Sequence, residues 1–476
     1  MRLKSVYIYT IGCQMNVYDS ELMAASLKPL GYETGDNPEE ADAIIVNTCT
    51  IREKAEQKAF SFLGRLPGLK TKNPSLIIAV GGCVAQQEGR AILKRMPHVD
   101  LVFGTRAVSR LSDHFQVIEK TRRRIVDVLE ETDFDSFNNP GVSLEDLTLG
   151  AVCRFVTIMQ GCDNYCTYCV VPHVRGREKS RTPDAIYNEI ETLTENGVRE
   201  VTLLGQNVNS YGIKEGHLAF PGLLRKIHAI PGLLRIRFTT SHPKDLSHDL
   251  ISAFAELDKL CPHIHLPVQS GSNDVLRRMN RKYTREVYLD KVNRLKGACP
   301  EIALTSDFIV GFPGETDGDF DLTMDLIETV GYDGVFAFKY SDRPIAPASR
   351  FKDKIDEEVK SQRLSVLLSR QEEITAKKNG ALVGETVTVL VEGTGKPLAN
   401  AENRGNNGES GQSVQWTGRT PQNKIVHFCL GLSDETGYDH NDLSGHIVEV
   451  RITRALSHSL WGEAVLKGKG RRSHAA

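Results

Sequence analysis

Residues 161–169 read GCDNYCTYC and contain three cysteines, Cys162, Cys166 and Cys169, in the spacing C-x3-C-x2-C. Three thiolates spaced in this way within one loop can bind three corners of a four-iron cluster, but they suit a tetrahedral zinc ion poorly. A closed structural site normally has four protein ligands, as in tetrathiolate zinc or the usual iron–sulfur cubane. A set of three therefore leaves one iron open to bind and activate another molecule.

The alternative interpretation of this loop is a zinc knuckle, which needs a fourth protein ligand. His173 lies four residues after Cys169 and could supply it. The cysteine spacing and the strand pattern around the loop favour the iron–sulfur site.

The strand that precedes the loop, RFVTIM, is the first of six apolar strands that alternate with helical patterns. The other five are REVTLLGQ, LRIRFTTS, HIHLPVQS, ALTSDFIVGF and GVFAFKYS. Six such units predict an incomplete (β/α)6 barrel. In barrels of this kind the chemistry takes place at the C-terminal ends of the strands, and the cysteine loop follows the first of these ends.

Polar residues follow the other strands at the same expected barrel mouth, where they suit a nucleoside with ribose hydroxyls and an amino-acid carboxylate. They are Gln206, Asn207, Asn209, Ser241, His242, Gln269, Ser270, Asp307 and the segment Gly311 to Glu315. Each of them alone would more often be a loop or cap residue. Arg281 could pair with the carboxylate, and the alternative for Arg281 is an arginine on a helix surface.

A second set of three cysteines, Cys13, Cys49 and Cys83, is scattered through the N-terminal quarter of the chain. The apolar strands VYIYTI, AIIVN, LIIAVGG and DLVFG alternate there with helical patterns, which predicts a parallel sheet with both faces covered. Each cysteine follows the end of one strand, and ligands gather at that edge of an open parallel sheet. We therefore expect the three thiols to converge on an auxiliary four-iron cluster.

Glycines beside these cysteines would let the backbone approach a bulky cluster; they are Gly12, Gly81 and Gly82. The alternative is that the three cysteines are ordinary buried residues. We assign the remaining cysteines to packing, namely Cys153, Cys261, Cys299 and Cys429.

The expected fold class is α/β, with three domains. Residues 1–125 form the N-terminal parallel sheet domain, residues 148–377 the barrel, and residues 378–467 a small β-barrel of the oligonucleotide-binding kind. An acidic linker from about Glu130 to Leu149 separates the first two, and a helix from Ile355 to Lys378 leaves the barrel. The third domain contains a Gly/Asn/Ser-rich loop from Asn400 to Gln412.

The composition is that of an ordinary globular protein of two or three domains, with 476 residues, 40% hydrophobic and 25% charged. No segment is typical of a signal peptide or of a membrane span, so we expect a cytoplasmic protein. A net charge of −2 means that any nucleic-acid surface must be local. The candidates are Arg175, Arg177, Lys179, Arg181, Arg419, Arg451, Arg454, Lys467, Lys469, Arg471 and Arg472.

Several motifs together make the chain resemble the radical S-adenosylmethionine methylthiotransferases over nearly its whole length. The motifs are GCQMN, NTCTIREKA, GGCVAQ, GCDNYCTYCVVPHVRGREKSR, LLGQNVNSY, RFTTSHP, HLPVQSGS and DFIVGFPGE, followed by an RNA-binding module of the TRAM type. The resemblance implies that the cluster on Cys162, Cys166 and Cys169 cleaves S-adenosylmethionine and that the auxiliary cluster holds the sulfur to be donated. S-adenosylmethionine would be bound by Gln206, Asn207, Ser241, Gln269, Arg281 and Asp307.

The implied reaction transfers a methylthio group to C2 of N6-(dimethylallyl)adenosine at tRNA position 37, next to the anticodon. No catalytic side chain beyond the cluster ligands is expected, because the cofactors carry such chemistry. The expected partners are tRNA, through its anticodon stem-loop, and an external electron donor such as flavodoxin, with no membrane and the protein as a monomer.

Three alternatives remain open at this point. Two keep the chemistry but change the substrate, to threonylcarbamoyl adenosine in tRNA or to an aspartate in a ribosomal protein. The third, from another class, is a noncatalytic iron–sulfur protein that binds RNA. The chain also departs from the family pattern, because it has Ile345 and Ala346 where members usually have a glycine and a threonine.

Overall fold

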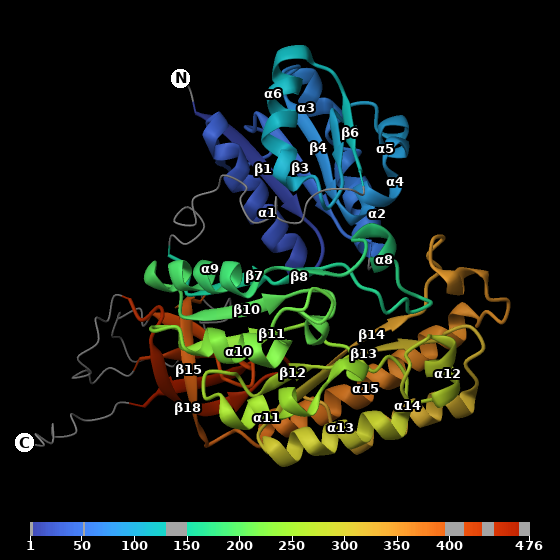
Figure 1. Cartoon of the computed structure of the whole chain (residues 1–476), viewed down its shortest axis with the longest axis vertical. Coiled ribbons are helices and arrows are strands. Elements are labelled where there is room, and N and C mark those ends of the chain that lie inside the picture. The colour runs from blue at the N-terminus through green and yellow to red at the C-terminus, as the bar shows by residue number, and fades with distance from the viewer. Residues whose placement is uncertain (1–2, 51–52, 130–149, 396–413, 431–441, 466–476) are drawn as a thin grey trace, which may run out of the picture.

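The computed structural model describes residues 3–50, 53–129, 150–395, 414–430 and 442–465. The expected acidic linker, the whole Asn400 to Gln412 loop and the basic tail from Lys467 lie outside these ranges. Figure 1 shows the N-terminal sheet domain stacked on a central barrel, with a small β-barrel against one end of that barrel. The predicted α/β class with its three units is confirmed.

The N-terminal domain is a six-stranded sheet in the order β2-β1-β3-β4-β5-β6, and every neighbouring pair is parallel. Its strands are β1 (Lys4–Thr10), β2 (Tyr32–Thr34), β3 (Ala43–Thr48), β4 (Ile77–Gly82), β5 (Leu101–Phe103) and β6 (Ile125–Asp127). Every residue of β3 and β4 is buried, as the continuous apolar runs predicted.

Helices cover both faces of this sheet. One face carries α1 (Gln14–Leu27), η1 (Lys28–Leu30), η2 (Val108–Arg110) and α6 (Leu111–Thr121). The other carries α2 (Glu53–Leu63), α3 (Pro67–Lys72), α4 (Cys83–Glu88) and α5 (Arg90–Arg95). Both faces of the sheet are therefore covered, which leaves the C-terminal ends of its strands, where loops emerge, for contacts with other groups.

The central domain contains two three-stranded parallel sheets, in the orders β11-β10-β7 and β12-β13-β14. A parallel bridge between Ile236 and Leu260 joins them into one open barrel, which confirms the predicted six-stranded arrangement. The strands are β7 (Cys153–Thr157), β10 (Glu200–Leu204), β11 (Arg235–Phe238), β12 (His263–His265), β13 (Ala303–Val310) and β14 (Gly334–Lys339).

Helices alternate with these strands; the longer ones pack outside the barrel, and four short ones lie in the loops after β10, β11, β12 and β14 at its mouth. The helices are α9 (Pro183–Glu195), η4 (Val208–Ser210), α10 (Phe220–His228), η5 (Pro243–Asp245), α11 (His248–Glu256), α12 (Asn273–Arg278), α13 (Arg285–Ala298), α14 (Asp317–Val330), η6 (Pro347–Arg350) and α15 (Glu357–Gly380). Side-chain caps fix where five of them begin, because a hydroxyl accepts a backbone N–H of the first turn. The caps are Thr182, Ser247, Ser272, Thr284 and Thr316.

The cysteine loop lies between short elements at the barrel mouth. An antiparallel pair, β8 (Met159–Gln160) and β9 (Lys179–Ser180), closes its base, and α8 (Val171–Val174) follows the cysteines. Figure 1 shows α8 at the junction of the N-terminal domain and the barrel.

The C-terminal module is a closed barrel in the order β15-β16-β17-β19-β18, as predicted. Its strands are β15 (Thr386–Thr394), β16 (Gln415–Arg419), β17 (Ile425–Cys429), β18 (Ile447–Ala455) and β19 (Leu460–Ala464). The turn after β16 docks under the central barrel, because Arg237 donates from Nη1 to the Pro421 carbonyl (2.8 Å) and from Nη2 to the Thr420 carbonyl (2.7 Å). Since β11 begins at Arg235, the module lies at the end of the barrel opposite the mouth.

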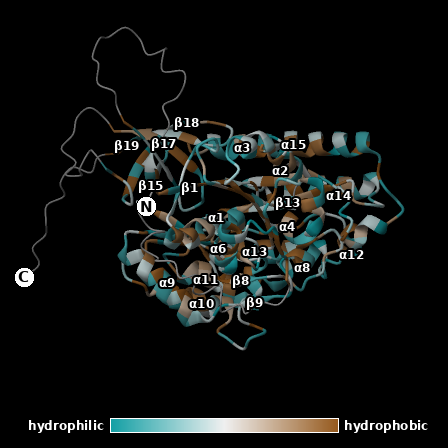
Figure 2. Ribbon diagram, turned by 90° about the horizontal axis from the view of Figure 1, so that it is seen from above, coloured by the Kyte–Doolittle hydropathy of each residue, from teal (hydrophilic) through white to brown (hydrophobic). Residues whose placement is uncertain are grey.

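Viewed from above and coloured by hydropathy, the outer helices α9, α10, α14 and α15 show both teal and brown, as amphipathic helices do (Figure 2). Within the ranges that the structure describes, no helix is long and apolar enough to cross a membrane.

Candidate iron–sulfur centres and barrel mouth

The three cysteines of the barrel loop lie close enough to affect one another's ionisation. Burial raises the pKa of Cys169 to about 12, and the charges of Cys166 and Cys162 add to the increase. Burial also raises the pKa of Cys162, with Cys166 contributing. Iron ligands must be deprotonated thiolates, and positive irons between the sulfurs would remove this mutual repulsion. The donor set therefore fits a cluster that three thiolates share.

The segment that follows α12 holds the cysteine loop in place. Thr167 N donates to the Met279 carbonyl (3.1 Å), and Asn280 Nδ2 donates to the Tyr165 carbonyl (2.9 Å). At the start of the loop Gly161 has φ +82°, and a Cβ there would lie 2.1 Å from the Arg177 carbonyl oxygen. Only glycine fits this position.

Arg281 also helps to hold the cysteine loop in place. It is 3% exposed and donates to Tyr283 Oη (3.0 Å), Cys166 Sγ (3.4 Å) and the Pro267 carbonyl (2.5 Å). The alternative of an arginine on a helix surface is therefore wrong. Most of its donors are engaged in holding the cysteine loop against β12, and pairing with a carboxylate stays a prediction.

Buried polar atoms gather beside this loop at the ends of β10 and β11. Asn209 Oδ1, Ser241 Oγ and His242 Nε2 are buried and have no hydrogen-bond partner in the part of the chain that the structure describes. They are neighbours, because Asn209 Nδ2 donates to the His242 carbonyl (3.5 Å). Buried polar groups are normally paired, so this arrangement fits a polar ligand such as a nucleoside.

Of the predicted mouth residues, Gln206 and Asn207 support the site. Gln206 Oε1 accepts the backbone N–H of Gly161 at the start of the cysteine loop. Asn207 Oδ1 accepts the His242 N–H (3.1 Å), and its Nδ2 donates to Asp245 Oδ2 (2.7 Å) and Ser210 Oγ (2.9 Å). Three of the four hydrogen bonds available to this amide are therefore used within the protein.

Gln269 and Thr240 have strained backbones at this mouth, with φ +78° and +69°. Such strain in residues other than glycine is concentrated at functional sites. Asp307 lies at the level of Gln269, whose N–H donates to its carbonyl (2.9 Å), but β13 continues to Val310. Asp307 is therefore inside the barrel rather than past a strand end, and its Oδ1 is 3.4 Å from His265 Nε2. Asp307 is thus set back from the end of its strand, deeper than the expected mouth, and its contact with S-adenosylmethionine stays a prediction.

The second cysteine set meets at the point where the strand order of the N-terminal sheet reverses, between β1 and β3. Ligands bind at such switch points. Cys13 precedes α1, Cys49 follows β3, and Cys83 begins α4 after β4. A hydrogen bond with Cys49 is the main reason why the pKa of Cys13 is lowered to about 6. Burial raises the pKa of Cys83.

Two asparagines that sequence reasoning passed over lock the Cys13 and Cys49 loops together. Asn16 Nδ2 donates to Asn47 Oδ1 (3.0 Å) and to the Thr48 carbonyl (3.1 Å), and Asn47 Nδ2 donates to the Asn16 carbonyl (2.8 Å). Asn16 Oδ1 accepts the Cys13 N–H (3.3 Å). Both lie within the motifs GCQMN and NTC, which was the available signal.

The glycines beside these cysteines are required by close packing. A Cβ at Gly12 would lie 2.8 Å from the Cβ of Cys49, and one at Gly82, with φ +91°, would lie 2.4 Å from the Thr48 carbonyl oxygen. A Cβ at Gly81 would meet the Phe103 ring at 2.4 Å. Gly12 therefore lets two cysteine loops approach each other, whereas Gly81 serves sheet packing.

Among the residues described, no three His, Cys, Asp or Glu side chains are gathered as ligands of one metal ion. Cluster thiolates each bind a different iron, so they need not share such a geometry. His173, the candidate zinc ligand, is exposed. Cys261 and Cys299 are buried, as we expected of packing residues.

The basic residues predicted as a local nucleic-acid surface divide into two groups. Arg175 and Arg181 are buried and pair with Asp19 and Glu189, and the partly exposed Arg419 pairs with Glu392. The exposed ones in the described ranges are Arg177, Lys179, Arg451 and Arg454.

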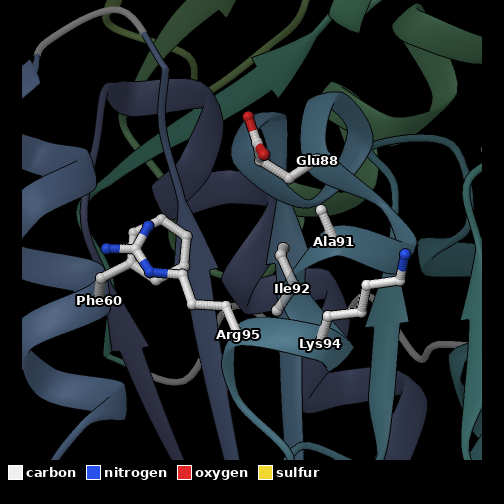
Figure 3. Close-up of a pocket in the computed structure, with 6 residues that line it drawn as sticks. All are labelled: Phe60, Glu88, Ala91, Ile92, Lys94 and Arg95. Carbon is white, nitrogen blue, oxygen red and sulfur yellow. The ribbon is translucent and has the colours of Figure 1, made fainter.

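Two cavities lie away from these sites. One of about 400 Å³ on the N-terminal domain is lined by Phe60, Glu88, Ala91, Ile92, Lys94 and Arg95 (Figure 3). In it the Arg95 guanidinium lies over the Phe60 ring, 3.8 Å from its centroid. The other, of about 700 Å³, lies between the central barrel, α15 and the C-terminal module, with His263, Phe336 and Lys424 among its lining residues.

Comparison with known families matches two parts of the chain. Residues 5–104 match the family described as Uncharacterized protein family UPF0004. Residues 156–327 match the Radical SAM superfamily.

Curated relatives are similar over the whole chain. The tRNA-2-methylthio-N(6)-dimethylallyladenosine synthase of Desulfosudis oleivorans is 52% identical over 477 residues, covering 100% of both chains. The enzyme of that name from Geotalea uraniireducens is 48% identical over 97% of this chain and 99% of its own. The one from Clostridium botulinum is 46% identical over 96% of each.

Solved structures share the fold at low identity. The radical S-adenosylmethionine methyltransferase TsrM from Kitasatospora setae has a TM-score of 0.53 and 14% identity, covering 73% of this chain and 75% of that one. The cobalamin-dependent S-adenosylmethionine radical enzyme OxsB has a TM-score of 0.51 and 14% identity, covering 78% of this chain and 58% of that one.

Proposed function

Because the chain belongs to the family of tRNA-2-methylthio-N6-dimethylallyladenosine synthases, we propose that it transfers a methylthio group to C2 of N6-(dimethylallyl)adenosine at tRNA position 37. It is a radical S-adenosylmethionine enzyme that acts on tRNA and uses S-adenosylmethionine and two four-iron clusters. The observation that carries the proposal is 52% identity over the full length of a relative of this name. The noncatalytic alternative is set aside, because the family is one of enzymes.

We assign the radical S-adenosylmethionine cluster to Cys162, Cys166 and Cys169 and the auxiliary cluster to Cys13, Cys49 and Cys83. When bound, the clusters and S-adenosylmethionine supply the radical chemistry that replaces the C2 hydrogen of the adenine by a methylthio group. The side chains of the protein hold, orient and shield these groups.

At the barrel mouth the roles fall into two sets. Arg281, Gln206 and Asn207 fix the cysteine loop and the ends of β10 and β11. The unpaired polar atoms of Asn209, Ser241 and His242 orient the nucleoside and amino-acid parts of S-adenosylmethionine. Burial lowers the pKa of His242, so its ring is neutral. Since Nδ1 accepts the Lys244 N–H (3.2 Å), the proton is on Nε2, which can donate to a ligand.

The substrate base must leave its stack to reach this mouth, which costs least for a nucleotide that is already unpaired. An anticodon loop provides such a nucleotide. We propose that the C-terminal module holds the tRNA through exposed residues of β18 and β19, where Arg454 lies 6.0 Å from the ring centroid of Trp461. An exposed arginine beside a partly exposed aromatic ring suits phosphate and base contacts.

We also propose the division into residues 1–125, 148–377 and 378–467, and a monomer that works in the cytoplasm with an electron donor such as flavodoxin. Gel filtration with light scattering tests the monomer, and single turnovers with reduced flavodoxin test the donor.

The test of the function is an anaerobic reaction of the reconstituted protein with S-adenosylmethionine, a reductant and two tRNAs of one sequence. One tRNA carries N6-(dimethylallyl)adenosine and the other carries unmodified adenosine at position 37. The expected product is the methylthio nucleoside from the first tRNA only. Product from neither tRNA, with both clusters present, would overturn the proposal.

A further inference from the structure

Arg175 connects the two cysteine sites. It lies six residues after Cys169, at the C-terminal end of α8, and its side chain enters the N-terminal domain. There its Nη2 donates to Asp19 Oδ2 at 2.9 Å. Arg175 is 4% exposed and Asp19 is 1% exposed. The short segment after Cys169 therefore places the buried positive charge of Arg175 beside the second cysteine site.

The N-terminal domain fixes the backbone on which Arg175 sits. Thr105 Oγ1 donates to the Val174 carbonyl (2.9 Å), and Arg106 Nη2 donates to the Arg175 carbonyl (3.0 Å). Val174 packs against Cys83 in a small buried cluster. Figure 1 shows α8 at this domain junction, below α4. The position of the guanidinium is thus set by packing rather than by a free side chain.

The charge of Arg175 acts on the cysteines of the auxiliary site. Burial raises the pKa of Cys83, and Arg175 opposes that increase. The hydrogen bond with Cys49 is the largest cause of the lowered pKa of Cys13; burial opposes it, and the charge of Arg175 lowers the pKa further. The Arg175 side chain also hydrogen-bonds with Cys83, while its Nη1 atom is buried and has no acceptor among the described residues. A buried, charged donor without an acceptor is costly, so a ligand of the site is expected to supply one.

We propose that Arg175 is a positioning residue of the auxiliary cluster. Its Nη1 donates a hydrogen bond to a sulfur of the cluster, and its positive charge favours the reduced, more negative state of the cluster. Hydrogen bonds to sulfur and local net charge are what a protein uses to set the potential of such a cluster. The inference rests on the assignment of Cys13, Cys49 and Cys83 to that cluster, proposed above.

The competing explanation is that Arg175 and Asp19 form only a buried ion pair that holds two domains together. Breaking such a pair from either side is destabilising, so both substitutions would then act alike. A role in setting the potential instead predicts effects of opposite sign, because one substitution removes a cation near the cluster and the other removes an anion.

The experiment uses the full chain with Cys162, Cys166 and Cys169 replaced by alanine, so that only the auxiliary cluster gives a signal. After anaerobic reconstitution, its midpoint potential is measured by redox titration followed by electron paramagnetic resonance. Arg175→Met should make reduction at least tenfold less favourable, which for one electron is about 59 mV. Asp19→Asn should shift the potential upward.

Arg154→Met is the matched control. Arg154 Nη1 donates to Glu21 Oε1 (2.9 Å), so it also pairs the barrel with α1, but it is not among the main groups that shift the pKa of Cys13 or Cys83. Its removal should leave the potential unchanged. If Arg175→Met fails to assemble the cluster, Arg175→Lys, which keeps the charge but not the planar fork, should assemble it at a lowered potential.

Three results would overturn the inference: an unchanged potential in both Arg175 variants, shifts of equal sign in Arg175→Met and Asp19→Asn, or a control that shifts as far as Arg175→Met. A parent protein that binds no auxiliary cluster would instead overturn the assignment of the cysteines, and the inference with it. Iron content of the parent therefore separates the two failures.

Discussion

Arg237→Met should detach the C-terminal module from the central barrel. The guanidinium is 5% exposed, donates to the carbonyls of Thr420 and Pro421, and pairs through Nε with Glu200 Oε1 at 2.9 Å. A hydrogen bond from a charged donor contributes about 1.5–3 kcal/mol. Leaving Glu200 buried without its closest partner adds to the loss, although Arg235 Nη1 remains 3.9 Å from Glu200 Oε2. Because such contributions are not additive, we expect the module to lose about 3 kcal/mol of stability.

Tryptophan fluorescence isolates this effect. The chain has two tryptophans, Trp416 and Trp461, and both lie in the C-terminal module. Urea unfolding followed at these residues therefore reports on that module. Arg225→Met is the control, since Arg225 forms exposed ion pairs with Asp249 and Glu256, which contribute at most about 1 kcal/mol. A loss below about 1 kcal/mol in Arg237→Met would refute the docking account.

Three further predictions concern separate sites. Cys49→Ala should keep deoxyadenosine production from S-adenosylmethionine but give no methylthio product; equal loss of both activities would point to a purely structural N-terminal cluster. Arg454→Ala should weaken tRNA binding and reduce the log–log salt slope by about one unit, whereas Arg419→Ala, whose side chain pairs with Glu392, should leave the slope unchanged in binding curves at several salt concentrations. Burial raises the pKa of Glu178 from its ordinary value of 4.5 to about 7 in the folded protein. Folding therefore favours the protonated carboxyl, and the free energy of unfolding falls as pH rises from 4.5 through about 7. Urea unfolding should accordingly show Glu178→Gln gaining stability over the parent at pH 8 relative to pH 5, and an equal difference at both pH values would refute it.

The fold was predictable because its strands have simple patterns. The buried runs of β3 and β4 and the six barrel strands alternate with amphipathic helices, and the parallel topology then brings Cys13, Cys49 and Cys83 to one edge. The short edge strands β2 and β6 were missed, since YET and IVD lack the continuous apolar run of the equally short β5, LVF.

The polar residues of the site were harder to predict, because their roles depend on partners far away in the sequence. Arg175 was expected on a basic surface but is buried against Asp19. Arg281 was expected to pair with a ligand carboxylate, and its contact with Cys166 was not foreseen. Local sequence does not encode which long-range carboxylate or thiol a basic residue will meet. Asn16 and Asn47 were overlooked for the same reason, although both lie beside cysteines.

The departure from the family pattern lies beside the auxiliary site. Ala346 is 2% exposed and packs with Cys83, Val170 and Val174, whereas Ile345 is 40% exposed. Members of the family usually have a threonine at this position, so the alanine leaves the surroundings of Cys83 without that hydroxyl. The structure thus puts the two substitutions in different environments, one at the cysteines and one at the surface.

The central claim is that this chain methylthiolates N6-(dimethylallyl)adenosine in tRNA, and nucleoside mass spectrometry of bulk tRNA tests it most directly. Cells that lack the protein should lose 2-methylthio-N6-(dimethylallyl)adenosine and accumulate the nucleoside without the methylthio group. The wild-type chain should restore the product, and the variant with Cys162, Cys166 and Cys169 replaced by alanine should not. Unchanged levels of this nucleoside, or loss of methylthiolation from threonylcarbamoyl adenosine instead, would contradict the account.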